Sequence, residues 1–83
     1  MYWASSEIAL DFQKTVYMEL YLNGELRQFD SGLDIHRLVE QLGLAGHRIA
    51  VEVNRQIVPK SQHAGYPLQD GDRVEIIQAM GGG

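Results

Sequence analysis

Two strand-like segments on either side of Asn23-Gly24 are the feature that most constrains this sequence. Apolar and polar residues alternate over residues 18–22, which is the pattern of a half-buried strand. Asn-Gly supplies the positive φ angles that both central positions of a type I′ turn require. Residues 25–29 then form the returning strand. The sequence therefore predicts an antiparallel hairpin.

A short helix is predicted to follow the hairpin. Asp34 is a favourable N-cap residue, and Gly43 fits the position just after a helix, where a left-handed residue ends it. The apolar residues between them recur at the spacing of one helical face, and they are Ile35, Leu38, Val39 and Leu42. This pattern predicts a helix of about two and a half turns that packs on the hairpin.

Three more short strands are predicted. Residues 49–53 alternate, Ile57-Val58 is a short piece that Pro59 ends, and residues 73–77 follow the tight turn Asp70-Gly71-Asp72. The order strand, strand, helix, strand, short strand, strand predicts an α+β protein. We expect the β-grasp (ubiquitin-like) fold, with a mixed four- to five-stranded sheet packed on one main helix.

The regular pattern also suggests the domain boundaries. Residues 1–17 show no clean period, and their apolar residues fit either a loose amphipathic helix or a mobile arm. Met18 is a second candidate initiator, so residues 1–17 are expected to be a flexible or non-native extension. Residues 18–80 form the β-grasp domain, in which residues 60–68 read as polar and irregular. Residues 81–83 form a flexible glycine tail.

Composition excludes several classes of function. The chain contains no cysteine, which rules out a disulfide framework, a thiolate metal site and a cysteine nucleophile. Its net charge of −4 argues against nucleic acid as the main partner. No apolar run approaches the ~20 residues that span a membrane, and the N-terminus does not read as a secretory signal. We therefore expect a cytoplasmic location and no membrane partner.

Side-chain chemistry in the body of the chain is sparse. His36, His47 and His63 lie singly, without the spacing of metal ligands, so we expect solvated or capping histidines and no metal. The basic residues Arg48, Arg55 and Lys60 are expected to belong to a solvated face, with a role in docking as the weaker alternative. No P-loop is present, so the chain itself is not expected to bind ATP or any other cofactor.

The tail Gly81-Gly82-Gly83 carries the most informative chemistry. Glycine orders at a high entropic cost and buries no side chain, so these residues are not expected to serve packing. A segment without side chains is instead long and narrow enough to enter a confined channel. Gly81 and Gly82 would thread a narrow channel and bring the carboxylate of Gly83 into a partner's active site. Activation as an acyl-adenylate would make that carboxylate a good acyl donor. A sulfur donor could then displace the adenylate and leave a thiocarboxylate on Gly83.

A partner surface is predicted near this tail. If the even-numbered residues of the last strand point into the core, Ile77 and Ala79 flank the opposite face, next to Met80. Tyr21 also points away from the buried face of the first strand. These four residues could dock a partner, because apolar exposure beside a functional tail has a plausible use. The alternative is ordinary scattered apolar surface.

Residues 18–83 closely resemble the ThiS family, the sulfur carriers of thiamine (thiazole) biosynthesis. The most specific matching stretch is Val53-Asn54-Arg55-Gln56-Ile57-Val58-Pro59. The other matching elements are Leu22-Asn23-Gly24, Leu38-Val39-Glu40-Gln41-Leu42-Gly43, Ile49-Ala50-Val51-Glu52-Val53-Asn54 and Asp70-Gly71-Asp72-Arg73-Val74-Glu75. The chain ends in three glycines, whereas many members of the family end in two.

The resemblance implies a protein cosubstrate and not an enzyme. An ATP-dependent ThiF-like enzyme would adenylate Gly83, a cysteine desulfurase or related donor would supply sulfur, and a ThiG-like thiazole synthase would receive it. Three alternatives stay open. They are a MoaD-like carrier for molybdopterin synthesis, a β-grasp interaction module whose tail is never activated, and a ubiquitin-like modifier joined to lysines through Gly83.

Overall fold

The computed structural model describes residues 17–79 of the 83-residue chain. The strands are β1 (Tyr17–Leu22), β2 (Glu25–Asp30), β3 (Ile49–Val53), β4 (Gln56–Val58) and β5 (Arg73–Gln78). One α-helix, α2 (Ile35–Gln41), and one 3-10 helix, η1 (Lys60–Gln62), complete the elements. The predictions for Met80, for residues 81–83 and for residues 1–16 of the extension lie outside the described residues.

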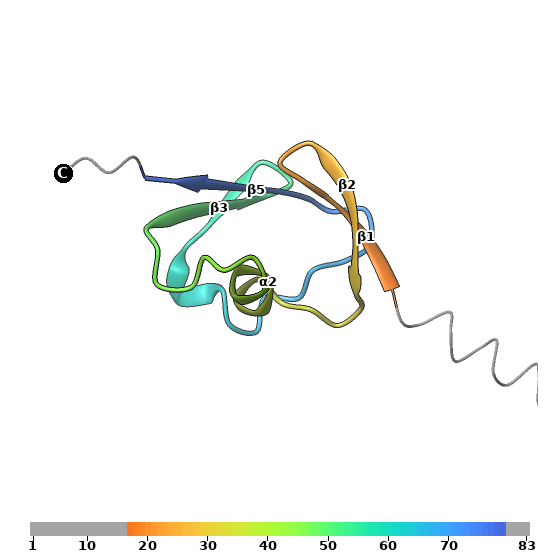
Figure 1. Ribbon diagram of the computed structural model, residues 1–83, viewed down its shortest axis with the longest axis horizontal. Coiled ribbons are helices and arrows are strands. Elements are labelled where there is room, and N and C mark those ends of the chain that lie inside the picture. The colour runs from red at the N-terminus through yellow and green to blue at the C-terminus, as the bar shows by residue number, and fades with distance from the viewer. Residues whose placement is uncertain (1–16, 80–83) are drawn as a thin grey trace, which may run out of the picture.

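The strands form one mixed five-stranded sheet in the order β2-β1-β5-β3-β4 (Figure 1). The central pair, β1 and β5, is parallel, and the other neighbours are antiparallel. Helix α2 lies against one face of the sheet, which we call the inner face (Figure 1). The predicted β-grasp fold is therefore confirmed, with five strands on one main helix.

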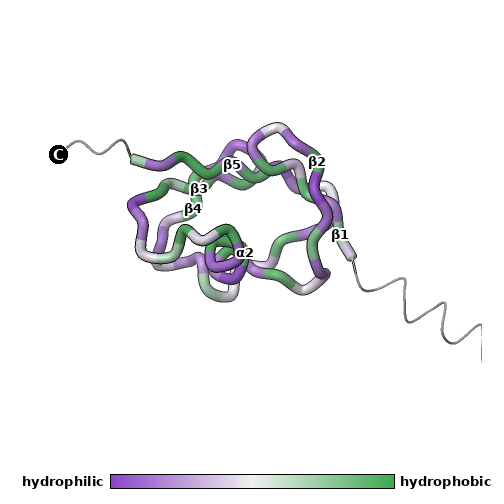
Figure 2. The backbone as a smooth tube through the Cα atoms, in the orientation of Figure 1, coloured by the Kyte–Doolittle hydropathy of each residue, from purple (hydrophilic) through white to green (hydrophobic). Residues whose placement is uncertain are grey.

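The core fills the space between the inner face and α2. Leu20 of β1, Val51 of β3 and Val74 of β5 are almost fully buried, and they pack with Ile35 and Leu38 of the helix. Alternation along the strands leaves the intervening side chains on the opposite, outer face. Figure 2 shows the hydrophobic and hydrophilic residues interspersed along the strands in this way.

Two turn asparagines extend the hydrogen bonding on both sides of β5. The Asn23 Oδ1 atom accepts from the Ile76 N–H at 2.8 Å, and the Asn54 Oδ1 atom accepts from the Arg73 N–H at 3.0 Å. Both asparagines have φ of 51°, a left-handed conformation that asparagine tolerates better than most residues. The central strand is thus held beyond the ends of its regular ladders.

Helix α2 has only seven residues, so its free N-terminal N–H groups matter. The carbonyls of Tyr66 and His63 accept from Ile35 N–H at 3.2 Å and from His36 N–H at 3.3 Å. The predicted N-cap is confirmed, because Asp34 accepts from the Arg37 N–H through Oδ1 at 2.8 Å. The helix start therefore depends on the segment that follows β4.

That segment differs from the prediction. Residues 60–68 were expected to be polar and irregular, but they begin with the 3-10 helix η1 and bury two side chains, His63 and Leu68. The His63 Nε2–H group donates to the Val58 carbonyl at 2.9 Å. Leu68 N–H donates to the Leu33 carbonyl at 3.0 Å. Periodicity could not reveal this packing, because the segment has no repeating apolar spacing.

We predict that Asn23→Ala is more destabilising than Asn23→Gly. Both changes leave the Ile76 N–H without its acceptor, at a cost of about 1–3 kcal/mol. Alanine adds roughly 1–2 kcal/mol because it resists a positive φ. Urea unfolding measures both variants, with the exposed Gln28→Ala as a control expected within about 0.5 kcal/mol of the parent. Equal stability of Asn23→Ala and the parent would contradict this role.

A second prediction concerns acid stability. The backbone N–H groups of Arg37 and Gly65 donate to the Asp34 carboxylate and hold its pKa below the ordinary value of 3.8. The carboxylate therefore stabilises the fold above pH 3.8, and this contribution is lost as pH falls through the lower folded-state pKa. The urea midpoint of the parent should fall more steeply below that pH than that of Asp34→Asn. Parallel pH profiles would refute the assignment.

Candidate functional site

Strand β5 leads directly to the predicted functional tail. Its side toward β3 is paired from Val74 to Gln78, and the Ala79 N–H donates to the Arg48 carbonyl at 2.9 Å. The last described residue is therefore still attached to the sheet. Gly81, Gly82, Gly83 and Met80 lie outside the described residues, so their functional roles stay predictions.

The structure places the described residues of the predicted partner surface on the outer face. Tyr21 is 42% exposed and Ile77 is 52% exposed, and Ala79 is exposed next to the tail. Tyr21 of β1 lies opposite Arg73 of β5. Arg73 is four residues before Ile77, so Tyr21 and Ile77 are about 13 Å apart along the strand direction. Ile77 and Ala79 are therefore close to the tail, whereas Tyr21 belongs to the other end of the face.

The outer face carries more apolar surface than the sequence analysis identified. Leu26 is 52% exposed and lies directly opposite Tyr21, and Ile57 of β4 is 68% exposed. The sequence held a signal for both, because the neighbours of buried strand residues must face outward. The large exposed hydrophobic residues of the described chain together form what we call the outer-face apolar patch. Its members are Tyr17, Tyr21, Leu26, Ile57 and Ile77.

Charged side chains share this face with the patch. The Arg73 guanidinium carbon lies 5.9 Å from the centre of the Tyr21 ring, within the range of a cation–π contact. Glu52 and Glu75 lie directly opposite each other on β3 and β5, an arrangement in which like charges repel. A partner that presents a cation between these two carboxylates would relieve the repulsion.

A shallow hollow lies beside the end of β5. It has a volume of about 450 Å³, and its lining includes Ile77, Ala79, Arg48 and Lys60. Arg48 and Lys60 were expected to lie on a solvated face, and both are exposed. Arg48 and Lys60 are therefore accessible to a protein that binds at Ile77 and Ala79, just before the tail.

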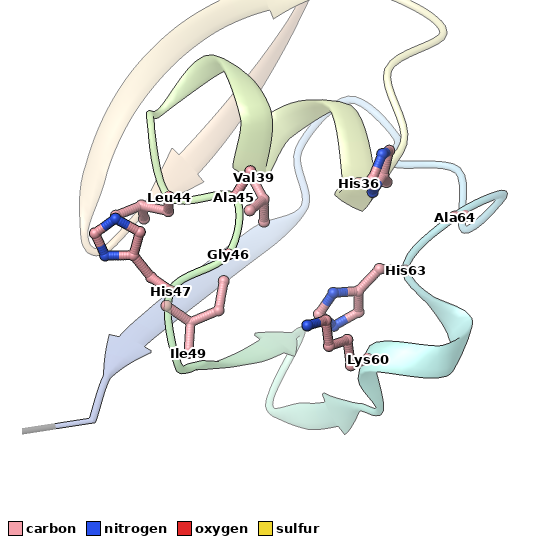
Figure 3. A pocket seen from close by; sticks show the side chains of 10 residues that line it. All are labelled: His36, Val39, Leu44, Ala45, Gly46, His47, Ile49, Lys60, His63 and Ala64. Carbon is pink, nitrogen blue, oxygen red and sulfur yellow. The ribbon is translucent and has the colours of Figure 1, made fainter.

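A second pocket lies between α2 and η1 and gathers the three histidines (Figure 3). It has a volume of about 260 Å³, and His36, His47 and His63 line it together with Lys60. Of the two expectations for the histidines, solvated or capping, the first is wrong for His63, which is only 7% exposed and bonded to the Val58 carbonyl. His63 is instead the C-cap residue of η1. Within residues 17–79, no group of three or more His, Cys, Asp or Glu residues is arranged to hold a metal ion.

No helix in the described part of the chain is long and apolar enough to cross a membrane. The described residues form an outer face that carries both apolar and charged side chains, and the central strand β5 ends just before the tail residues.

Comparisons with known proteins agree with this architecture. Residues 20–83 match the ThiS family. Over 66 residues, 80% of this chain, the sequence is 36% identical to the whole of the sulfur carrier protein ThiS of Escherichia coli. It is 42% identical over 66 residues to a thiazole synthase of Paramagnetospirillum magneticum, but the chain spans only 20% of that longer protein.

A solved structure shows the same fold. The crystal structure of the thiamine biosynthesis protein ThiS from Geobacter metallireducens superposes with a TM-score of 0.69 at 30% sequence identity. The match covers 80% of this chain and 100% of that one. Since the family match extends from Leu20 to Gly83, and a whole sulfur carrier is covered at 36% identity, the chain belongs to the ThiS family.

Proposed function

We propose that this protein is a sulfur carrier for thiazole formation and that it acts as a cosubstrate of other enzymes. One observation carries the proposal. The central strand β5 is paired with β3 up to its end, and Ala79 is still bonded to Arg48. Residues 80–83 are the four residues after Ala79, and Gly83 is the last of the four. Those four residues span at most about 14 Å, so a protein that grips the domain also positions the terminal carboxyl.

The proposed chemistry takes place at the carboxyl of Gly83. A ThiF-like partner uses ATP to convert the carboxylate to an acyl-adenylate and releases pyrophosphate. A cysteine desulfurase or a related donor then supplies sulfur as a persulfide, whose outer sulfur attacks the activated carbonyl, so that AMP leaves and an acyl disulfide forms. A second thiol cleaves the S–S bond of this acyl disulfide, is itself oxidised to a disulfide with the donor, and releases the thiocarboxylate on Gly83. The resulting thiocarboxylate is a nucleophile that needs no cysteine, in keeping with a sequence that has none. Because the cycle consumes ATP, we place it in the cytoplasm.

A ThiG-like thiazole synthase is the proposed acceptor of the sulfur. Two thiazole synthases, from Paramagnetospirillum magneticum and Magnetococcus marinus, each contain a stretch similar to this chain that makes up 20% of their length. Such relatives support a close functional association between a ThiS-like domain and thiazole synthase. The proposed docking surface is the part of the outer face beside the tail, at Ile77 and Ala79.

Sulfur loading tests the assignment of the reactive group to Gly83. Incubation with ATP, the adenylating enzyme and a sulfur source should raise the intact mass by about 16 Da, the difference between sulfur and oxygen in a thiocarboxylate. A variant that lacks Gly82 and Gly83 should keep the fold, because these residues follow the last strand, but should gain no sulfur. Sulfur loading of the truncated protein would contradict the assignment to Gly83.

Other outcomes of the same assay identify the competing functions. An unchanged mass of the full chain, with an adenylating enzyme shown to be active on another carrier, would indicate a β-grasp interaction module. High-mass conjugates would indicate a protein modifier. Transfer of sulfur to molybdopterin synthesis and not to thiazole would indicate a MoaD-like carrier.

A second prediction tests the docking surface. Ile77→Asp places a charge on the outer face beside the tail, and we expect the affinity for the adenylating partner to fall roughly 30-fold, the effect of an interface hot spot. Ile57→Asp is the matched control, because Ile57 is also an exposed isoleucine of the outer face but lies on the edge strand β4. Its effect should stay within about twofold. An equal loss of affinity for the adenylating partner in the two variants would argue against docking at Ile77 and Ala79.

A further inference from the structure

Two neighbouring hollows of the surface form one groove beside the tail. The pocket between α2 and η1 and the hollow at the end of β5 share the lining residues Gly46, His47, Ile49 and Lys60. Figure 3 shows the part nearer α2, where His47 and Ile49 lie on one side and Lys60 on the other. From there the groove continues to Ala79. We call the surface that these two hollows form the tail-side groove.

The tail-side groove carries positive charge that the described part of the chain does not neutralise. Arg48 and Lys60 line it, and none of its described lining residues is an aspartate or a glutamate. The single ion pair within residues 17–79 joins His36 to Glu40, so neither Arg48 nor Lys60 has an acidic partner there. The chain as a whole has 11 acidic and 7 basic residues. Two unpaired cations on one surface therefore depart from its overall acidity.

Apolar side chains line the same groove. Val39, Leu44 and Ile49 belong to its α2 end, and Ile77 and Ala79 belong to its β5 end. The two hollows have volumes of about 260 Å³ and about 450 Å³. They follow each other along the surface, so they suit an extended segment better than a compact molecule. The occupant that this lining fits is a peptide segment with both apolar and acidic side chains.

We propose that the tail-side groove binds an extended acidic segment of the protein that adenylates the tail. The carboxylates of this segment pair with Arg48 and Lys60, and its apolar side chains contact Ile49 and Ile77. The Arg48 carbonyl accepts from the Ala79 N–H at 2.9 Å, so a segment held at Arg48 lies where the sheet ends and the tail begins. The identity of the partner rests on the proposed function, whereas the chemistry of the occupant does not.

A peptide titration tests the groove in the isolated full chain. The probe is a capped peptide in which aspartate and leucine alternate, added at millimolar concentration to the isotopically enriched protein. We expect the NMR signals of the Gly46, Ala50 and Ala64 amides, which line the groove, to shift until the site is saturated. The amides of Leu26 and Gln28, on the edge strand β2 at the opposite side of the sheet, should stay unchanged. Absence of groove shifts, or larger shifts at Leu26 and Gln28, would overturn the proposal.

Three controls complete the titration. A peptide in which asparagine replaces aspartate should bind roughly tenfold more weakly, and equal binding would show that the cations do not select the occupant. Arg48→Gln together with Lys60→Gln should weaken binding of the acidic peptide roughly tenfold, since one exposed charge pair contributes up to about fivefold. Both side chains are exposed, so the double variant should keep the fold. Groove shifts on concentrating the protein alone would identify a second copy as the occupant and would contradict the proposal.

The same double variant tests the partner. At low ionic strength, Arg48→Gln with Lys60→Gln should bind the adenylating enzyme roughly tenfold more weakly than the parent. At about 1 M salt, where the Debye length is about 3 Å, this difference should nearly vanish. Arg27→Gln is the matched control, because Arg27 is an exposed arginine of β2, and its effect should stay within about twofold.

The two measurements separate the groove from the proposed function. Equal affinity of the double variant and the parent at low ionic strength would refute the adenylating enzyme as the source of the segment, even where the peptide binds in the groove. Failure of the parent chain to load sulfur would count against the proposed function alone, because the peptide titration uses the isolated chain.

Discussion

The hydrogen bonds that hold β5 in the centre of the sheet are the constraint on which the rest of the structure depends. This strand pairs with β1 on one side and with β3 on the other. Its parallel contact with β1 is short, with only two residue pairs in register. The side chains of Asn23 and Asn54 supply the missing acceptors on the two sides. Because both asparagines sit in tight left-handed turns, the two hairpins and the central strand form one unit.

The loop before β5 is tied down by the same means. The Asp72 carboxylate accepts from the side-chain Nδ2–H of Asn54 at 3.0 Å and from the backbone N–H of Gln69 at 2.9 Å. The Asp70 carboxylate accepts from the backbone N–H of Glu19 at 2.7 Å. These bonds fix where β5 enters the sheet, and the β3 ladder fixes where it leaves. Strand β5 is therefore fixed at both ends, and the carboxyl group on which the proposed function depends belongs to the fourth residue after Ala79.

Much of this fold could be predicted from particular residues. Asn23-Gly24 identified the hairpin, Asp34 and Gly43 bounded the helix, and the alternation after Arg73 identified the last strand. In the stretches Val53–Pro59 and Asp70–Glu75, which carried the family resemblance, the side chains of Asn54, Asp70 and Asp72 act in the structure as hydrogen-bond partners of the backbone or of one another. Resemblance in these segments therefore reports on the fold, and the glycine tail alone bears on the chemistry.

Other features were beyond the reach of the sequence for physical reasons. His63 is buried because its ring bonds to a carbonyl five residues earlier, and the backbone geometry that brings them together has no sequence period. The first N–H groups of α2 donate to the carbonyls of Tyr66 and His63, which only the tertiary structure brings close to the helix. The outer-face apolar patch draws its five members from β1, β2, β4 and β5, and their common face follows from strand order.

We propose that the sulfur travels on the carboxyl of Gly83, because a chain without cysteine has no thiol to carry it. The most direct measurement is thiazole formation in a reconstituted system with a semisynthetic chain whose Gly83 carboxyl is blocked as an amide. We expect the amide to retain the fold and to dock, but to support no thiazole formation because it cannot be adenylated. Thiazole formation at the rate of the unblocked chain would contradict it.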